Sequence, residues 1–127
     1  EHTVGVASLC QTLTQWHPRL NPDLLLAAGL VHDLGYTRTW RLGATFEMTD
    51  EGRLLGHLAL SDAIVAEAAS RSGLDSDLAL ALRHAVAWHH GPPANQPPAS
   101  GSPEALALWR INSLEAGVKS RLEGGGT

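Results

Sequence analysis

The stretch that most restricts how this chain can fold is an apolar run that ends in two polar residues. Residues 24–31 read LLLAAGLV, and His32 and Asp33 follow them directly. A run this apolar predicts a buried helix, so its end should lie inside the protein. Burying an ionised carboxylate without a partner costs several kcal/mol. The pair therefore needs local hydrogen bonds or a divalent cation, which binds imidazole nitrogen and carboxylate oxygen together.

Composition limits the class of protein. At 127 residues the chain is long enough for one domain with one core. Hydrophobic residues make up 43% of it and aromatic residues 5%, and the abundant Leu and Ala favour helices over strands. The formal net charge is −4, and the nine Lys and Arg residues do not cluster. No basic nucleic-acid-binding surface is therefore predicted within this stretch.

Cysteine content and targeting signals bear on where the protein works. Cys10 is the only cysteine, which excludes an internal disulfide and leaves histidines and carboxylates as candidate metal ligands. No apolar run approaches the ~20 residues of a membrane span, and no signal-peptide pattern is visible. We expect a cytoplasmic protein. Because the chain opens at Glu1 without Met and has a candidate ligand at position 2, we also expect it to be part of a longer protein.

The first two helices are predicted from their apolar faces and end signals. Residues 3–16 carry apolar side chains at spacings of three and four, namely Val6, Leu9, Leu13 and Trp16. Asn21 followed by Pro22 is a strong start signal for the second helix. That helix is expected to run to about Leu34, with Gly35 as a left-handed C-cap.

Three more helices follow from capping residues. Asp50 is expected to cap the third helix, which ends near Gly73. Asp75 or Ser76 caps the fourth, and the pair at 102–103, Ser-Pro, begins the fifth. The chain is thus predicted to be an all-α bundle of about five main helices.

The connections are predicted to be irregular at two places. Residues 36–49 lose helical periodicity and read as a loop, with a short hairpin as an option. Residues 91–103 contain five prolines and form a second long loop, and long loops in compact domains are often functional. We expect one domain over residues 1–123 and a disordered tail over 124–127.

The histidines fall on successive helices of this arrangement. The candidates are His2, His32 with Asp33, His57, and the pair His89 and His90. One buried histidine is unremarkable, but core-facing histidines from four helices are costly unless something coordinates them. Imidazoles near their usual pKa of about 6.5 are neutral at neutral pH, as metal ligands must be. The alternative, a purely structural helical bundle, requires all these inward histidines to be coincidental.

This order of ligands resembles the HD-domain superfamily of metal-dependent phosphohydrolases. The segments EHTVGVASLC, LLLAAGLVHDLG, EGRLLGHLAL, LRHAVAWHHG and EALALWRINSLEA are similar to the HD domain of bacterial 3′–5′ exoribonucleases. In those enzymes a nucleic-acid-binding OB-fold precedes the HD domain. The similarity covers most of residues 1–119 and implies an HD-type helical bundle.

The resemblance also implies residue roles. His2, His32, Asp33 and Asn112 match the ligands of a first metal, and Asn112 stands where the family has Asp. Asp33 would bridge to a second metal held by His57, His89 and His90. His32 and Asp33 are thereby the implied catalytic pair. The implied cofactor is one or two divalent ions, with Mn²⁺ the first expectation and Fe²⁺, Mg²⁺ or Zn²⁺ as alternatives.

The implied reaction is hydrolysis of a phosphodiester by a metal-bound hydroxide that attacks phosphorus in line. The implied substrate is single-stranded RNA or DNA, degraded from its 3′ end. Two other functions stay open: a phosphohydrolase for nucleotides or a cyclic dinucleotide, and a catalytically weakened module that binds nucleotide or a partner. The sequence does not address the oligomeric state.

Two departures from the family pattern bear on activity. Asn112 replaces an anionic ligand with a neutral amide, and Glu115, one turn further on, is the candidate compensating group. Tyr36 stands where a Lys often follows the His-Asp-Leu-Gly segment and can meet substrate phosphate. Three arginines could replace that Lys, since guanidinium binds phosphate well: Arg38, Arg41 and Arg53.

The tryptophans are assigned by position. Trp16, Trp88 and Trp109 lie on predicted helices and are expected in the core. Trp40 lies in the loop beside the His-Asp corner and is the candidate for contact with bases.

The remaining polar candidates are given structural or supporting roles. His84 is expected to pack or hydrogen-bond, and His17, at a helix end, is expected to be exposed. Glu1 is a candidate for orienting His2, since metal-binding imidazoles are usually held by a second polar partner.

Overall fold

The structure is a computed structural model that describes residues 1–43 and 45–125. Its main elements in chain order are α1 (His2–Trp16), α2 (Pro22–Val31), α3 (Tyr36–Thr39), β1 (Trp40–Leu42), β2 (Phe46–Met48), α4 (Asp50–Ser72), α5 (Ser76–Ala87) and α6 (Pro103–Ser120). A 3₁₀ turn, η1 (Pro98–Ser100), and a π-helical turn, η2 (Arg121–Gly125), complete them. The predicted all-α bundle with five long helices is confirmed. Part of the predicted tail, residues 126–127, lies outside the described residues.

Three of the predicted helix starts are confirmed by capping hydrogen bonds. The Asn21 side chain accepts from the backbone N–H of Leu24 at 3.1 Å. Asp75 and Ser102 accept in the same way at the starts of α5 and α6. The prediction for α4 was wrong by one residue, because the hydroxyl of Thr49, and not Asp50, accepts the capping bond there.

The end of α2 also differs from the prediction. The helix stops at Val31, and Gly35 has φ −57° and ψ −25°, so it is not a left-handed cap. Because glycine has no Cβ, Gly35 instead allows the backbone to pack closely against α4. A Cβ at Gly35 would lie 2.1 Å from the carbonyl oxygen of His57 and 2.6 Å from the backbone nitrogen of Ser61. Gly35 therefore fixes how closely the His-Asp corner approaches α4.

The inner face of α1 is rotated from its predicted position. Val6, Ala7 and Cys10 are buried, whereas Leu9 is 37% exposed and Trp16 is 78% exposed. The reason is that α1 packs through its small residues: a Cβ on Gly29 of α2 would lie 3.5 Å from the Ala7 Cα. The prediction that Trp16 is a core residue was wrong. Trp88 is buried as expected, and Trp109 packs against the core.

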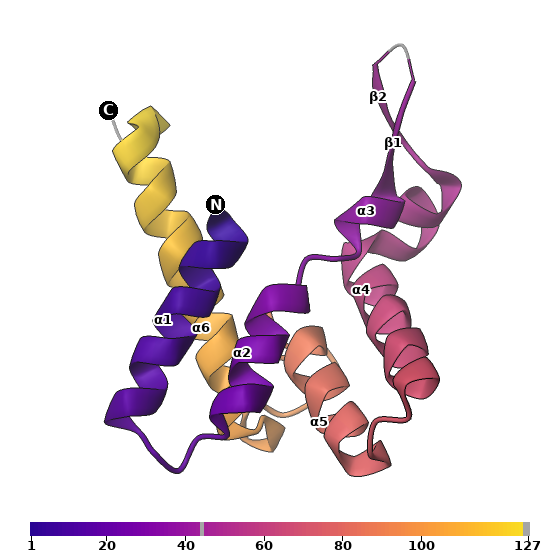
Figure 1. Ribbon diagram of the computed structural model, residues 1–127. Coiled ribbons are helices and arrows are strands. Elements are labelled where there is room, and N and C mark those ends of the chain that lie inside the picture. The colour runs from indigo at the N-terminus through magenta and orange to yellow at the C-terminus, as the bar shows by residue number, and fades with distance from the viewer. Residues whose placement is uncertain (44, 126–127) are drawn as a thin grey trace.

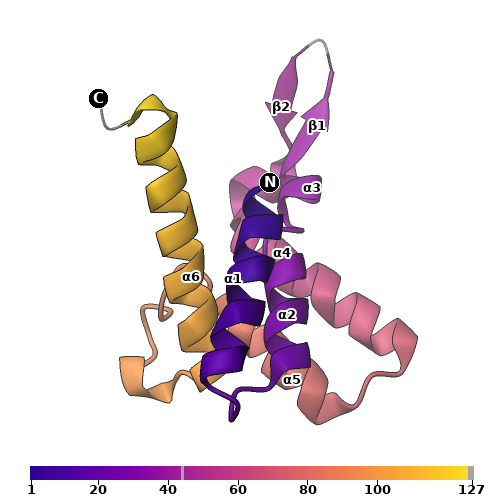
Figure 2. The same cartoon turned by 60° about the vertical axis from the view of Figure 1, so that its left-hand side comes forward.

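Figures 1 and 2 show the arrangement that creates the site. Helix α2 packs against α1, α5 and α6, and α5 in turn packs against α4. The carboxyl end of α2 thus lies deep in the bundle, between α1 and α4. The antiparallel β1–β2 hairpin, within the stretch where a loop or short hairpin was predicted, projects from the amino end of α4. Within the described residues, no helix combines the length and apolarity required to cross a bilayer.

Candidate metal centre

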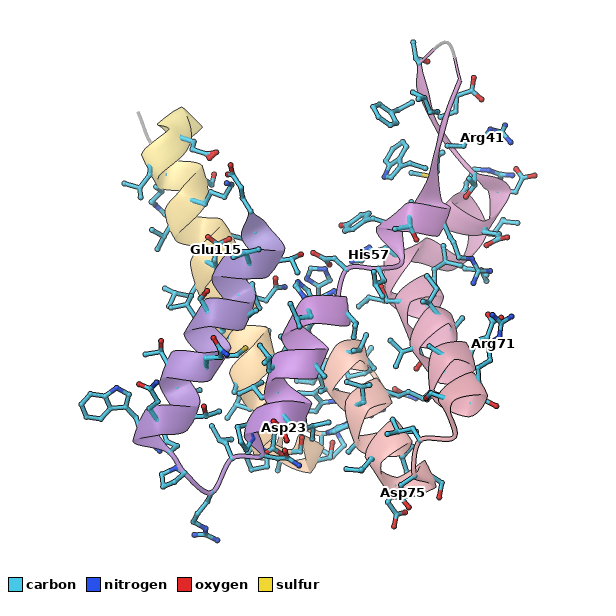
Figure 3. The ribbon with its side chains drawn as sticks, in the orientation of Figure 1. Asp23, Arg41, His57, Arg71, Asp75 and Glu115 are labelled. Atoms are coloured by element: carbon cyan, nitrogen blue, oxygen red, sulfur yellow. The ribbon has the colours of Figure 1, made fainter. Side chains whose placement is uncertain are left out.

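Asp33 lies between two groups of histidines that come from different helices. His2 begins α1, and His32 and Asp33 follow α2 directly. His57 belongs to α4, the pair His89 and His90 follows α5, and Asn112 belongs to α6. The structure therefore brings together side chains from five parts of the chain. Figure 3 labels one of them, His57.

The first group contains His2, His32 and Asp33, whose ligand atoms all lie within 4.8 Å of one another. The Oδ2 atom of Asp33 lies 3.1 Å from His32 Nε2 and 4.0 Å from His2 Nε2. Asn112 adds an oxygen, since its Oδ1 lies 2.7 Å from His2 Nε2. This group thus places two imidazole nitrogens and two oxygens close to one another.

The second group contains His57, His89 and His90. The Nε2 atoms of His57 and His90 are 2.8 Å apart, a distance that fits one shared proton or one shared cation. His89 Nε2 lies 3.4 Å from Asp33 Oδ1. The two oxygens of Asp33 thus face different groups, which is the arrangement of a bridging carboxylate.

The buried imidazoles are held in one tautomer by backbone carbonyls. His32 Nδ1 donates to the Gly29 carbonyl at 2.6 Å, and His89 Nδ1 donates to the Val86 carbonyl at 2.5 Å. Each Nδ1 proton is therefore fixed, and the Nε2 atom on the other side of each ring faces Asp33. Both rings are completely buried, and neither Nε2 has a hydrogen-bond partner. Such orphaned polar atoms are costly, and cations shared with Asp33 would satisfy them.

The electrostatics of the centre follow from this packing. Burial raises the pKa of Asp33, but the nearby His32 and His89 outweigh it and hold that pKa well below the ordinary value. Burial, together with His89, lowers the pKa values of His57 and His90. The carboxylate is therefore ionised and those two imidazoles neutral at pH 7, the states that bind divalent ions.

A further acidic residue, Glu115, contacts the His2 ring. The Glu115 carboxylate contacts His2 Nδ1, which leaves Nε2 on the side of Asp33 and Asn112. Glu1, the residue expected to orient His2, instead pairs with Lys119 at 3.0 Å. The sequence indicated Glu115 as the residue that could compensate for the neutral Asn112. It follows Asn112 by three residues, so both lie on one face of α6, and its observed contact is with His2.

The three candidate arginines all pair with neighbouring carboxylates on the surface. The Nη2 atom of Arg38 lies 2.9 Å from Glu51 Oε2, and that of Arg41 lies 3.3 Å from Glu47 Oε2. The Nη2 atom of Arg53 lies 3.2 Å from Asp50 Oδ1. In Figure 3, Arg41 points to the side of the hairpin away from His57. Their role in binding phosphate remains a prediction.

Tyr36 lies against the second group. Its ring stacks on His57 with centroids 4.4 Å apart and planes at 9°. Two other histidines behave as expected: His84 Nε2 accepts from the backbone N–H of Ser102 at 3.0 Å, and His17 is exposed.

The amino-acid sequence of this chain is similar to a known protein family and to several characterised proteins. A family profile described as HD domain matches residues 1–118. The 3′–5′ exoribonuclease YhaM of Bacillus licheniformis is 33% identical over 118 residues, which is 92% of this chain and 38% of that protein. The protein of the same name from Bacillus subtilis is 32% identical over 116 residues, covering 91% of this chain and 37% of its own length. The chain thus spans under two fifths of these relatives. No solved structure gave a significant match.

Proposed function

Because this chain belongs to the HD domain family, we propose that it is a divalent-metal-dependent phosphodiesterase that degrades single-stranded RNA or DNA from the 3′ end. The observation that carries the proposal is the pair of buried, unpartnered Nε2 atoms of His32 and His89 that approach the same carboxylate. The relatives are named 3′–5′ exoribonucleases, which supplies the direction and the substrate class of the proposal.

The residues divide into two sets of ligands. One ion would be held by His2, His32, Asp33 and Asn112, and the other by His57, His89, His90 and Asp33. Divalent ions bound there would supply Lewis acidity, which lowers the pKa of water and neutralises charge on phosphate oxygens.

The chain itself supplies orientation. The Gly29 and Val86 carbonyls fix the tautomers of His32 and His89 before any ligand arrives. The low pKa of Asp33 keeps its two oxygens free of protons, so each can face one group of histidines. Glu115 and Asn112 hold the His2 ring between them. Little rearrangement is therefore needed to assemble the site, which is the condition for electrostatic catalysis.

The test combines metal analysis with hydrolysis of an oligonucleotide labelled at its 5′ end. Purified without chelators, the protein should contain one or two divalent ions per chain. Chelation should abolish hydrolysis, and Mn²⁺ should restore it. His32→Ala should lower hydrolysis by about two orders of magnitude or more, the scale of removing one electrostatic stabiliser. His17→Ala, a change at an exposed histidine, is the control, and equal activity of both variants would contradict the proposal.

A second candidate is hydrolysis of nucleotides or a cyclic dinucleotide by the same centre. It is favoured by the pairing of Arg38, Arg41 and Arg53 with carboxylates, because these cations are then not free to follow a phosphate backbone. Turnover of mononucleotides well above that of oligonucleotides would select it. A third candidate, a binding module without turnover, is favoured by the neutral Asn112. Bound metal together with measurable hydrolysis would exclude it.

A further inference from the structure

The β1–β2 hairpin carries an uncovered apolar face. Trp40 pairs with Met48 and Leu42 pairs with Phe46, while Arg41 pairs with Glu47 between them. Because side chains alternate across a strand, the four apolar residues share one face and the charged pair occupies the other. The apolar side chains are 43% to 78% exposed. Within the described residues, this face therefore lacks a packing partner.

This face continues into the candidate metal centre. Tyr36, at the base of the hairpin, stacks on His57 of the second histidine group. A shallow hollow is lined by Tyr36, Thr37, Trp40 and Phe46. Arg41 lies on the opposite side of the hairpin from His57, so the apolar face is on the same side as the centre (Figure 3). We name this surface the hairpin face: Tyr36, Trp40, Leu42, Phe46 and Met48.

The chemistry of the hairpin face favours flat rings over charge. It exposes three aromatic side chains, those of Tyr36, Trp40 and Phe46. The nearby cations Arg38 and Arg41 are already paired with Glu51 and Glu47. A ligand that extends from the metal centre along this face would thus meet aromatic rings and few free charges. Unpaired nucleobases fit such a surface, since every base has a flat face to stack.

We propose that the hairpin face is a stacking platform for the bases of single-stranded nucleic acid whose end lies at the metal centre. The proposal rests on the proposed function for its substrate class. Beyond that function, it assigns the residues that would bind the strand and the interaction involved, which is stacking of bases on aromatic rings. A second copy of the chain or another protein could also cover an apolar face, but continuity with the metal centre through Tyr36 and His57 favours the nucleic acid.

The test measures binding with hydrolysis blocked by chelator. The probe is a fluorescein-labelled single-stranded dA 10-mer, and its comparison is a 10-mer of abasic sites with the same phosphates. Fluorescence anisotropy should show tighter binding of the dA 10-mer. Trp40→Leu should weaken that binding roughly tenfold, the order expected for one lost base–aromatic stack. Trp40→Phe keeps a ring and should retain most of the affinity, while Trp16→Leu removes an exposed Trp elsewhere and should change nothing.

Phe46→Ser is a second variant, which should also weaken binding of the dA 10-mer. Because the Phe46 side chain is 73% exposed, the fold should be retained, as circular dichroism would check. Equal binding of the dA and abasic probes, or equal affinity of Trp40→Leu and the unchanged protein, would overturn the proposal. Dissociation of an oligomer by Trp40→Leu with unaltered probe binding would also overturn it, in favour of a protein interface.

Hydrolysis assays separate this proposal from the proposed function. Metal-dependent hydrolysis of the dA 10-mer that is insensitive to Trp40→Leu would reject the stacking platform alone. Base-dependent binding that needs the Trp40 ring, without hydrolysis after Mn²⁺ addition, would support the platform and reject the phosphodiesterase.

Discussion

The side-chain amide of Asn112 donates a hydrogen bond of 2.9 Å to the carbonyl oxygen of His89. This bond joins α6 to the segment that carries the second histidine group. It also directs the other amide atom, Oδ1, towards His2 Nε2. Asn112 therefore does two things at once: it offers a neutral oxygen to the first group and fixes the backbone of the second.

Asn112→Asp should separate these two roles. A carboxylate adds negative charge near His2, so affinity for Mn²⁺ should rise, as measured by metal titration. The same change places a carboxylate oxygen against the His89 carbonyl, so the free energy of unfolding in chelator should fall by about 1–3 kcal/mol. Asn112→Ala, which loses the hydrogen bond without gaining charge, is the control. An Asp variant no tighter for metal than the Ala variant would contradict this account.

Glu115→Gln should weaken metal binding while the fold is retained. The Glu115 carboxylate contacts His2 Nδ1, and carboxylates in this position orient an imidazole and raise its basicity. Loss of such a partner typically lowers metal affinity by about 10- to 100-fold. Glu67→Gln is the matched control, since Glu67 pairs only with Arg71 on the surface among the described contacts. Equal affinities in the two variants would show that Glu115 has no positioning role.

Gly35→Ala should be severely destabilising. The added Cβ would lie 2.1 Å from the His57 carbonyl oxygen, so α4 must move away from the His-Asp corner. We expect a loss of more than about 3 kcal/mol in urea denaturation, the range of severe steric conflicts. Gly117→Ala in α6 is the opposite case, because nothing lies within 4 Å of its Cβ. That change should be neutral or stabilising by up to about 1 kcal/mol, and similar losses in both would refute the packing argument.

Cys10 should resist thiol reagents in the folded protein. The side chain is completely buried, and burial raises the pKa of its thiol to about 11. Only about one thiol in a thousand is then ionised at pH 8, so modification should be slow until denaturant is added. Because the folded pKa exceeds the unfolded one, its contribution to stability is complete below about pH 8.5 and declines towards pH 11. Cys10→Ala should lack this alkaline decline, and native labelling as fast as in urea would contradict the prediction.

The predictions that were correct depend on residues close together in the sequence, and those that were wrong depend on contacts between different helices. The starts of α2, α5 and α6 could be predicted because a cap and its target N–H lie within three residues. The inner face of α1 could not, because its rotation depends on how closely Gly29 of α2 approaches. The end of α2 was predicted wrongly for the same reason. Gly35 is required for close packing against α4 and does not cap α2.

The sequence by itself determined which side chains offer candidate donor atoms, namely six imidazole and carboxylate residues: His2, His32, Asp33, His57, His89 and His90. Only the tertiary structure decided which nitrogen of His32 and His89 remains free, that Asp33 faces both groups, and that Glu115 holds His2. Donor chemistry is a property of each residue alone. Tautomer, distance and partner are set by the packing of helices that lie far apart in the chain, and no local pattern encodes them.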